Sequence, residues 1–296
     1  MAISRAQLVK ELEPGLNALF GLEYKRYDNQ HAEIYTNESS DRAFEEEVML
    51  SGFANANVKV EGSGVNYDQS QETYTARYTH DTIALAFAIT EEAIEDNLYD
   101  KISSRYTKAL ARSMSNAKQV KAAAPLNNGL PTADGFDSGD GVSLFNTSHT
   151  TVSGTNVKNT LTTQADLNET SLEQALIDIA AFTDERGLRV AAKGVKMIIP
   201  SANQFSAERL LKSQGRTGTA DNDINAVASM GMVPQGYRVN NFLTDTDSWY
   251  IITDVPNGMK MFQRAALKTA MEGDFDTGNV RYKARERYSF GVSDYR

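Results

Sequence analysis

Residues 90–124, TEEAIEDNLYDKISSRYTKALARSMSNAKQVKAAA, form the best-defined element of the sequence. Thr90 is a suitable N-cap, Pro125 is expected to end the element, and acidic residues precede basic ones along it, as the helix dipole favours. At about 1.5 Å per residue the pattern predicts one helix of roughly 50 Å, longer than a compact domain usually needs. We interpret it as a beam with a narrow buried face. The expected buried positions recur at spacings of three and four: Ile94, Leu98, Ile102, Tyr106, Ala109, Ser113, Ala117 and Val120.

The segment before this helix is predicted to hold an arm and then a hairpin. Residues 1–50 contain a short amphipathic piece, expected to break at Pro14, followed by a polar stretch with too few apolar residues for a core of its own. Residues 51–89 alternate apolar and polar side chains in two runs, 73–79 and 82–90. Together with an earlier strand at 58–60 and a glycine-containing turn, they predict a long hairpin.

The segment after the helix is predicted to begin with a loop excursion and continue as an α/β unit. Residues 125–165 are rich in glycine, asparagine, aspartate and threonine and are expected to form a long loop with short strands. Residues 166–255 predict a compact α/β unit, and residues 256–296 predict a return to β structure. The expected elements of the unit are a helix over 169–186, a strand over 195–199, a helix capped by Ser201, a short helix near 224–230, and strands over 237–243 and 249–253.

Composition and charge exclude several classes of protein. The 296 residues include no cysteine, so disulfides, thiol nucleophiles and cysteine-ligated metals are excluded. Neither a signal-peptide pattern nor a run of 18 apolar residues occurs, so we expect no membrane. The net charge of −9 argues against a general nucleic-acid binder. Residues 1–100 hold 19 acidic and 7 basic residues and carry −12, whereas the remainder carries +3, which is either an acidic solvated face or complementarity between neighbouring copies.

The stretch SLFNTSHT, residues 143–150, raises the possibility of a Ser/His/Asp hydrolase, since three aspartates lie just upstream. Ser148 and His149 are adjacent, however, and in an extended chain they point to opposite sides. No G-x-S-x-G elbow is present, and the loop at 221–232 lacks the glycine and glutamate of a calcium-binding EF-hand. We expect no catalytic, cofactor-binding or metal-binding residue; a calcium ion at residues 134–140 is the weaker alternative to a solvated turn.

The last segment alternates apolar and basic side chains over residues 280–292, with Glu286 as the exception on the apolar side. A half-buried antiparallel strand with a wet basic face explains this pattern. The alternative is that these basic and aromatic side chains form a row that binds a single nucleic-acid strand. The arm, hairpin and beam cannot bury themselves on one monomer, so regular self-association is expected to cover them.

The order of these elements resembles that of tailed-bacteriophage major capsid proteins with the Hong Kong 97 type fold. The resemblance covers essentially the whole chain. Particular stretches also look like those of phage head subunits: ITEEAIEDNLYD (89–100), RYTKALARSM (105–114), LF-x3-H (144–149), VKMIIP (195–200) and VRYKARERYSFG (280–291).

The resemblance implies an α+β fold with five parts. These are an N-terminal arm (1–50), an extended β-hairpin loop (51–89), a peripheral domain with a spine helix (90–124) and the following loop (90–165), an axial α/β domain (166–255), and a return to the peripheral domain (256–296). It implies an icosahedral phage head built from pentamers and hexamers, in which arm and hairpin overlap neighbours. An encapsulin-like nanocompartment shell is the alternative with the same fold. A Ser/His hydrolase is a further alternative.

Further expectations concern partners and contact residues. The chain starts almost directly with the arm, so we expect a separate scaffolding protein, besides a portal protein and possibly a decoration protein. The shell would enclose DNA without sequence-specific binding and would assemble in the cytoplasm of the host bacterium. The expected contacts between subunits are made by Glu45, Glu46, Glu47, Lys59, Arg77, Arg105, Arg112, Arg281 and Arg285.

Overall fold

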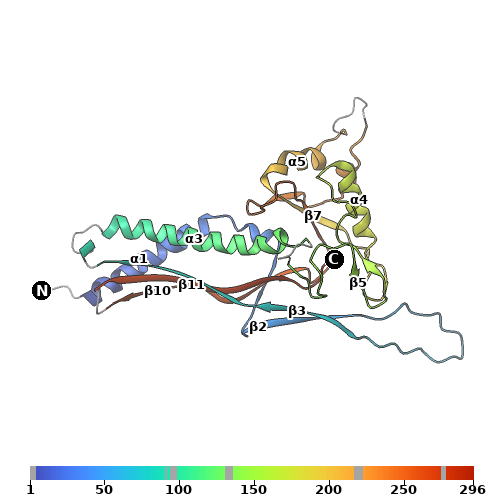
Figure 1. Cartoon of the computed structure of the whole chain (residues 1–296), viewed down its shortest axis with the longest axis horizontal. Helices are drawn as coiled ribbons and strands as arrows, with labels where there is room; N and C mark the ends of the chain where they lie inside the picture. Colours follow the sequence, from blue (N-terminus) through green and yellow to red (C-terminus); the bar gives the residue numbers. More distant parts are fainter. Residues whose placement is uncertain (1–4, 91, 94–98, 131–135, 217–222, 275–277) are drawn as a thin grey trace.

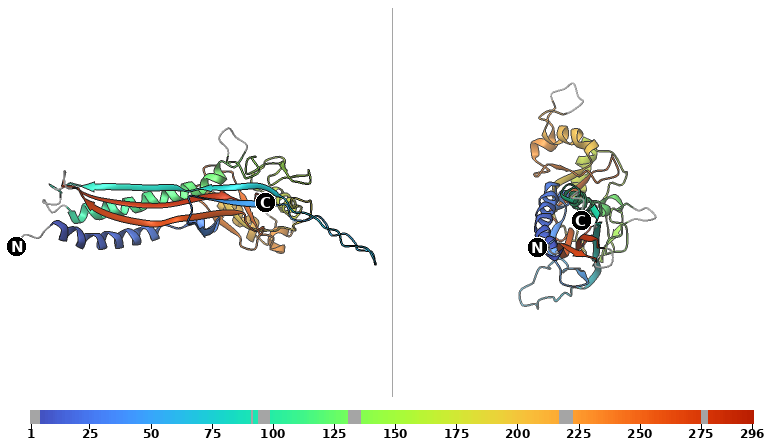
Figure 2. Two further views of the ribbon diagram at one scale, coloured as in Figure 1. Left: turned by 90° about the horizontal axis from the view of Figure 1, so that it is seen from below. Right: turned by 90° about the vertical axis from the view of Figure 1, so that its left-hand side faces the viewer.

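The chain folds into a long beam of helices and strands with a smaller lobe at one end (Figure 1). The computed structural model describes residues 5–90, 92–93, 99–130, 136–216, 223–274 and 278–296. The beam consists of a long sheet and of two helices that run along it, α1 (Arg5–Arg26) and α3 (Tyr99–Asn127). The two additional views show how narrow the beam is compared with its length (Figure 2).

The long sheet has the strand order β1-β10-β11-β4. β10 (Met259–Gly273) and β11 (Val280–Val292) form an antiparallel pair along the beam, β4 (Asp81–Ile89) pairs antiparallel with β11, and the short β1 (Thr36–Ser39) pairs parallel with β10. The predicted alternation of β11 is confirmed over residues 281–286, where Tyr282, Ala284 and Glu286 are buried while Arg281, Lys283 and Arg285 are exposed. From Arg287 to Val292 every residue is at least partly buried, so the predicted exposure of Arg287 is wrong.

The helix α1 is continuous, so the predicted break at Pro14 is wrong. Leu16 and Phe20 are buried together with residues of α3 and β11, and this packing holds the helix together around the proline. Asn17 adds two polar contacts, since its Oδ1 accepts hydrogen bonds from Thr269 Oγ1 at 2.7 Å and from Tyr282 Oη at 2.8 Å. The first part of the predicted arm therefore packs on the beam of its own chain.

The helix predicted over 90–124 is confirmed from Tyr99 onward as α3, but its predicted buried face is wrong. Tyr106 is 51% exposed and Val120 is 50% exposed, and Ile94 and Leu98 lie outside the described residues. Both sides of the helix carry alanines and isolated apolar residues, so periodicity alone did not decide which side meets the sheet. The side that packs on the sheet and on α1 includes Ser103, Thr107, Leu110, Ala111, Met114, Lys118 and Ala122.

Thr90 behaves as predicted, whereas the C-terminal end of the long helix differs from expectation. Thr90 is placed as a cap, because its Oγ1 accepts a hydrogen bond from the amide of Ala93 at 3.4 Å. Pro125 does not end the helix, which continues to Asn127. The proline lies in the last turn, where its ring costs one hydrogen bond but does not prevent the final residues from keeping helical geometry.

The hairpin consists of β2 (Phe44–Leu50) and β3 (Glu72–Thr79), which pair antiparallel. Its first strand therefore lies inside the predicted arm, and residues 58–60 are not a strand. The run at 81–89 is also not part of the hairpin, because it forms β4 of the long sheet. The acidic residues of Phe44–Leu50 obscured its alternating pattern in the sequence.

The lobe contains a three-stranded sheet in the order β8-β7-β9, flanked by helices (Figure 1). β7 (Gly194–Ile199) is central, with β8 (Tyr237–Val239) parallel and β9 (Tyr250–Thr253) antiparallel to it. The predicted α/β unit is confirmed at this level. The helices that accompany the sheet are α4 (Glu169–Ala180), α5 (Gln204–Lys212), α6 (Ala226–Met230) and the 3-10 turn η2 (Ser201–Asn203).

Several boundaries in and before the lobe differ from the predicted ones. α4 ends at Ala180 rather than at residue 186, and Gly187, with φ +82°, forms a later turn. The capping box of α4 uses Asn168 and Ser171, and Ser201 begins η2 rather than capping α5. The predicted loop excursion contains a short antiparallel pair, β5 (His149–Thr150) and β6 (Asn156–Val157), and the 3-10 turn η1 (Gln30–Glu33) precedes β1.

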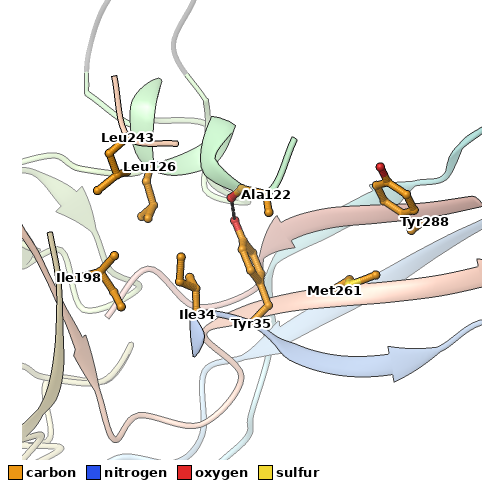
Figure 3. Close-up of a cluster of buried hydrophobic side chains, with 8 residues drawn as sticks. All are labelled: Ile34, Tyr35, Ala122, Leu126, Ile198, Leu243, Met261 and Tyr288. Carbon is orange, nitrogen blue, oxygen red and sulfur yellow. Dashed lines mark hydrogen bonds between the residues drawn. The ribbon is translucent and has the colours of Figure 1, made fainter. Parts of the chain in front are cut away.

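One apolar cluster joins the lobe to the beam (Figure 3). Tyr35 inserts between the sheet and the end of α3, and its Oη donates a hydrogen bond to the carbonyl of Ala122 at 2.7 Å. Ile198 contributes from β7 of the lobe. Lobe and beam therefore share a continuous core. The buried members of the cluster are Ile34, Tyr35, Ala122, Leu126, Ile198, Leu243, Met261 and Tyr288.

Candidate functional site

The most prominent surface feature is the hairpin loop, residues 51–71, which extends beyond the lobe into solvent (Figures 1 and 2). Its two sides are joined near the strands, where the amide of Ser51 donates to the carbonyl of Gln71 at 2.9 Å. The amide of Ala54 donates to Asp68 Oδ2 at 2.7 Å. Lys59, one of the predicted contact residues, lies exposed on this loop.

The hairpin loop exposes large apolar side chains to solvent. Val58 is 93% exposed and Tyr67 is 97% exposed. A row of exposed apolar side chains on a long projection is typical of a surface that binds another protein. The exposed large apolar side chains of the loop are Phe53, Val58, Val60, Val65 and Tyr67.

The three predicted glutamates at the base of the hairpin have partners within the chain. Glu45 Oε1 accepts a hydrogen bond from Ser40 Oγ at 2.7 Å, and Glu46 lies 3.8 Å from Arg77 Nε on the surface. Glu47 Oε1 lies 2.5 Å from the ammonium of Lys260, whose side chain is buried. Glu46 and Arg77 remain accessible to a neighbour, whereas Glu47 is occupied by the fold.

The predicted basic residues lie on two other surfaces. Arg105 and Arg112 are on the exposed side of α3, and Arg281 and Arg285 are on the outer face of the long sheet, away from the helices. Arg281 forms an ion pair with Asp274.

On the outer face of the sheet, Arg285 of β11 is directly opposite Lys268 of β10. Like charges in that register destabilise a sheet unless something neutralises them. The predicted contact residues thus lie on the hairpin, the spine and the outer sheet face, which suits contacts with several neighbours better than a single site.

His149 is fully buried, and the hydrolase interpretation fails on this geometry. Its Nδ1 donates to Asp140 Oδ2 at 2.6 Å, and its ring stacks on Tyr295. Burial raises the pKa of Asp140, but hydrogen bonds from His149 and Ser138 outweigh it and hold that pKa below its usual range. A histidine with no exposed surface cannot receive a proton from a bound substrate, so this pair serves the fold.

A buried ionic cluster next to His149 was not found by sequence reasoning. The guanidinium of Arg296 donates to Glu185 Oε1 at 2.5 Å, to Asp294 Oδ1 at 3.0 Å and to the carbonyl of Thr183 at 2.8 Å. Burial lowers the pKa of Arg296, but the carboxylates of Asp294 and Glu185 hold it above its usual value. No local motif marks the cluster, because Thr183 and Glu185 lie more than a hundred positions before Asp294 and Arg296 in the sequence.

A cleft of about 530 Å³ lies between the lobe and the beam. Phe145, Trp249 and Tyr250 are among the residues that line it, together with the ion pair of Lys158 and Asp178. Its described lining contains no histidine. Within the described part of the chain, no group of three or more metal-ligating side chains occurs, and no helix is long and apolar enough to cross a membrane.

Comparison with known proteins places the chain in a family. The model of the family described as "Phage capsid protein" matches residues 73–296, which is most of the chain. A search of curated proteins found no match.

Solved structures share the fold. The capsid of an empty GTA particle matches with a TM-score of 0.52 at 13% identity, and the match covers 91% of this chain and 88% of the GTA capsid chain. The capsid of Myoviridae phage XM1 has a TM-score of 0.52 at 12% identity, with 88% and 86% covered. A virus-like particle from Pyrococcus furiosus also has a TM-score of 0.52, at 11% identity, with 95% of both chains covered. From the family match, the chain belongs to the phage capsid protein family, and it shares with these capsids the α+β architecture of the Hong Kong 97 type fold.

Proposed function

We propose that this chain is the major head subunit, that the lobe over residues 166–255 closes the pentamers and hexamers, and that the hairpin ties each subunit to its neighbours. The observation that carries the proposed role of the hairpin is its loop, with Val58 and Tyr67 almost fully exposed. An isolated chain gains nothing by extending such residues into water. A neighbouring copy that covers them gains roughly 25 cal/mol for each Å² of apolar surface buried.

Charge distribution supports the same proposal. Glu46 and Arg77 on the hairpin, and Arg105, Arg112, Arg281 and Arg285 on the beam, are all exposed. Contacts between copies would neutralise the like-charged pair of Lys268 and Arg285 with carboxylates from the acidic N-terminal third of a neighbour. Our proposed domain division follows the five expected parts, with two changes. The hairpin runs from β2 to β3, and β4 is assigned to the peripheral domain because it belongs to the long sheet.

The finer features of the proposal concern partners. The shell would enclose double-stranded DNA without sequence-specific contacts, would assemble in the bacterial cytoplasm around a separate scaffolding protein, and would hold a portal and possibly a decoration protein. The chain's net charge of −9 is compatible with a wall that encloses DNA without binding it tightly. We also propose that the subunit has no hydrolytic activity, so ester turnover above background that is lost in His149→Ala would contradict us.

Electron microscopy of the purified chain, with and without a co-expressed scaffold, tests the hairpin proposal. The double variant Val58→Ser/Val60→Ser should leave the subunit folded but reduce closed shells at least tenfold. The matched control is Val152→Ser/Val190→Ser, which removes exposed valines from loops elsewhere and should assemble normally. Normal shells from the hairpin variant would contradict the proposal.

A second candidate function is a nanocompartment shell, since the fold is equally similar to the Pyrococcus furiosus virus-like particle. The two candidates differ in their contents. Particles isolated from cells should contain packaged double-stranded DNA if the chain builds a phage head, and a protein cargo without DNA if it builds a compartment.

A further inference from the structure

The hairpin is not part of the long sheet. Among the described residues, β2 and β3 form a two-stranded sheet of their own, without ladder hydrogen bonds to β1, β10, β11 or β4. The chain enters the hairpin after β1 and leaves it through His80 into β4. Its direction relative to the beam is therefore determined by side-chain contacts at its base, because no continuous ladder fixes it.

Lys260 of β10 is at the centre of these contacts. Its Nζ lies 2.5 Å from Glu47 Oε1 of β2 and 3.1 Å from Glu38 Oε1 of β1. The side chain of Lys260 is only 8% exposed, whereas Lys121, which forms an ion pair with Asp81 at the start of β4, is 40% exposed. Lysine is rarely buried unless it is paired, and its charge-assisted hydrogen bonds are then stronger than neutral ones. One ammonium thus links the hairpin to two strands of the long sheet.

A second chain of hydrogen bonds converges on the same glutamate. The hydroxyl of Ser293 donates to Glu47 Oε2, and Ser293 is also hydrogen-bonded to the hydroxyl of Tyr78 in β3. β2 through Glu47 and β3 through Tyr78 are therefore both connected to Ser293, the residue that follows β11 of the long sheet. Where the chain leaves the hairpin, the two ring nitrogens of His80 are hydrogen-bonded to the hydroxyls of Ser40 and Ser289, at 2.9 Å each.

The length of the hairpin loop makes its direction sensitive to these contacts. From Leu50 to the turn at Gly62 the chain spans 12 residues, or up to roughly 40 Å at about 3.3 Å per residue. A rotation of about 10° at the base would move the turn by roughly 7 Å over that length. A shift of that size would take Val58 and Tyr67 off any surface that they fit on a neighbour.

We propose that Lys260 is a positioning residue that fixes the direction of the hairpin, and thereby the angle at which neighbouring copies meet. The first half concerns the single chain, and only the second half rests on the proposed function. Glu47 is the partner through which Lys260 acts, and Glu38 anchors the ammonium to β1.

Distance measurement in the unassembled full chain tests the first half. The chain has no cysteine, so Asn66→Cys and Asn116→Cys, both at exposed positions on the hairpin loop and the spine, accept spin labels without competition. Dipolar spectroscopy should give one narrow distance distribution. Lys260→Met and Glu47→Gln should each widen it at least twofold. The control Lys121→Met breaks the exposed pair with Asp81 and should leave the width unchanged.

Circular dichroism establishes that each variant is folded. A distribution as narrow in Lys260→Met as in the parent would overturn the proposal, and so would equal widening in Lys121→Met. Electron microscopy then tests the second half, where Lys260→Met should give shells with at least a twofold wider spread of diameters. Uniform shells would overturn the role in assembly, whereas failure of the parent to form any shell would contradict the proposed function instead.

Discussion

The imidazole of His149 lies flat on the ring of Tyr295, with 3.8 Å between the ring centroids and 7° between the planes. Asp140 fixes the orientation of the imidazole through Nδ1. His149→Ala should therefore lower the free energy of unfolding by about 2–4 kcal/mol, because it opens a cavity and leaves Asp140 without its donor. Urea unfolding of the unassembled chain measures this loss. Ser148→Ala, at the adjacent position, should change stability by less than about 0.5 kcal/mol, and equal effects would contradict a structural role for His149.

His31 should make the subunit less stable in mild acid. Burial, assisted by the nearby Lys118, lowers the pKa of His31 to about 4. In the unfolded chain the pKa of this histidine is about 6.5, so the unfolded state binds the proton more strongly than the folded state. The free energy of unfolding therefore decreases as the pH is lowered from 6.5 to 4. The contribution between pH 7 and pH 5 is roughly 2 kcal/mol.

Urea unfolding of the parent and of His31→Gln at both pH values isolates this effect. The variant keeps a neutral polar side chain but cannot titrate. Between pH 7 and pH 5 its free energy of unfolding should therefore decrease by roughly 2 kcal/mol less than that of the parent. The same pH dependence in both proteins would show that other groups cause it.

Lys118 and Glu286 form a buried pair between α3 and β11, with 3.3 Å between Nζ and Oε2. Burial raises the pKa of Glu286, and Lys118 opposes the rise. Removing the ammonium alone, in Lys118→Met, should cost about 3–5 kcal/mol at pH 7, because the carboxylate is left uncompensated. The double variant Lys118→Met/Glu286→Leu should be more stable than this single variant.

The pH dependence of Lys118→Met provides a second check. With the ammonium gone, the folded-state pKa of Glu286 lies further above that of the unfolded chain, so stability is retained in acid and lost as the pH rises through the folded pKa. A double-mutant cycle at pH 5 and pH 8 measures both effects. Additive single effects would show that the two residues are not coupled.

The sequence predicted the long helix but not its orientation. Its length and charge order were visible, since a helix of about thirty residues needs only local regularity. The face that meets the sheet carries the buried Thr107 and Lys118, while Tyr106 and Val120 are about half exposed. Lys118 is buried because Glu286 lies opposite it, and that match depends on residues 168 positions apart.

The candidate contact surfaces also include features that the local sequence pattern predicts and features that depend on contacts between distant elements. Only one strand of the hairpin, Glu72–Thr79, was predicted from its alternating run, because the second run forms β4 of the long sheet. The other strand, Phe44–Leu50, was missed because three consecutive glutamates hide the period of two. Arg281 and Arg285 were placed correctly on an exposed face, because alternation along one strand is a local property. The roles of Lys260, Glu185 and Arg296 depend on contacts between distant elements and were not visible in the sequence.

Gly291→Ala should displace the hairpin from the other side of its base. A Cβ at Gly291 would lie 2.6 Å from Tyr78 Cε1, and the tyrosine ring cannot move away freely because it is buried against Phe262, with 4.8 Å between the ring centroids. Overpacking of this kind costs about 1–3 kcal/mol. Gly273→Ala is the matched control, since nothing lies within 4 Å of the added carbon.

Thermal unfolding compares the two glycine variants directly. Gly291→Ala should unfold at a lower temperature than the parent and should shift the distance between labels at positions 66 and 116, because Tyr78 carries β3 with it. Gly273→Ala should do neither. Parent-like stability and label distance in Gly291→Ala would mean that the close approach of Gly291 to Tyr78 does not hold the hairpin in place.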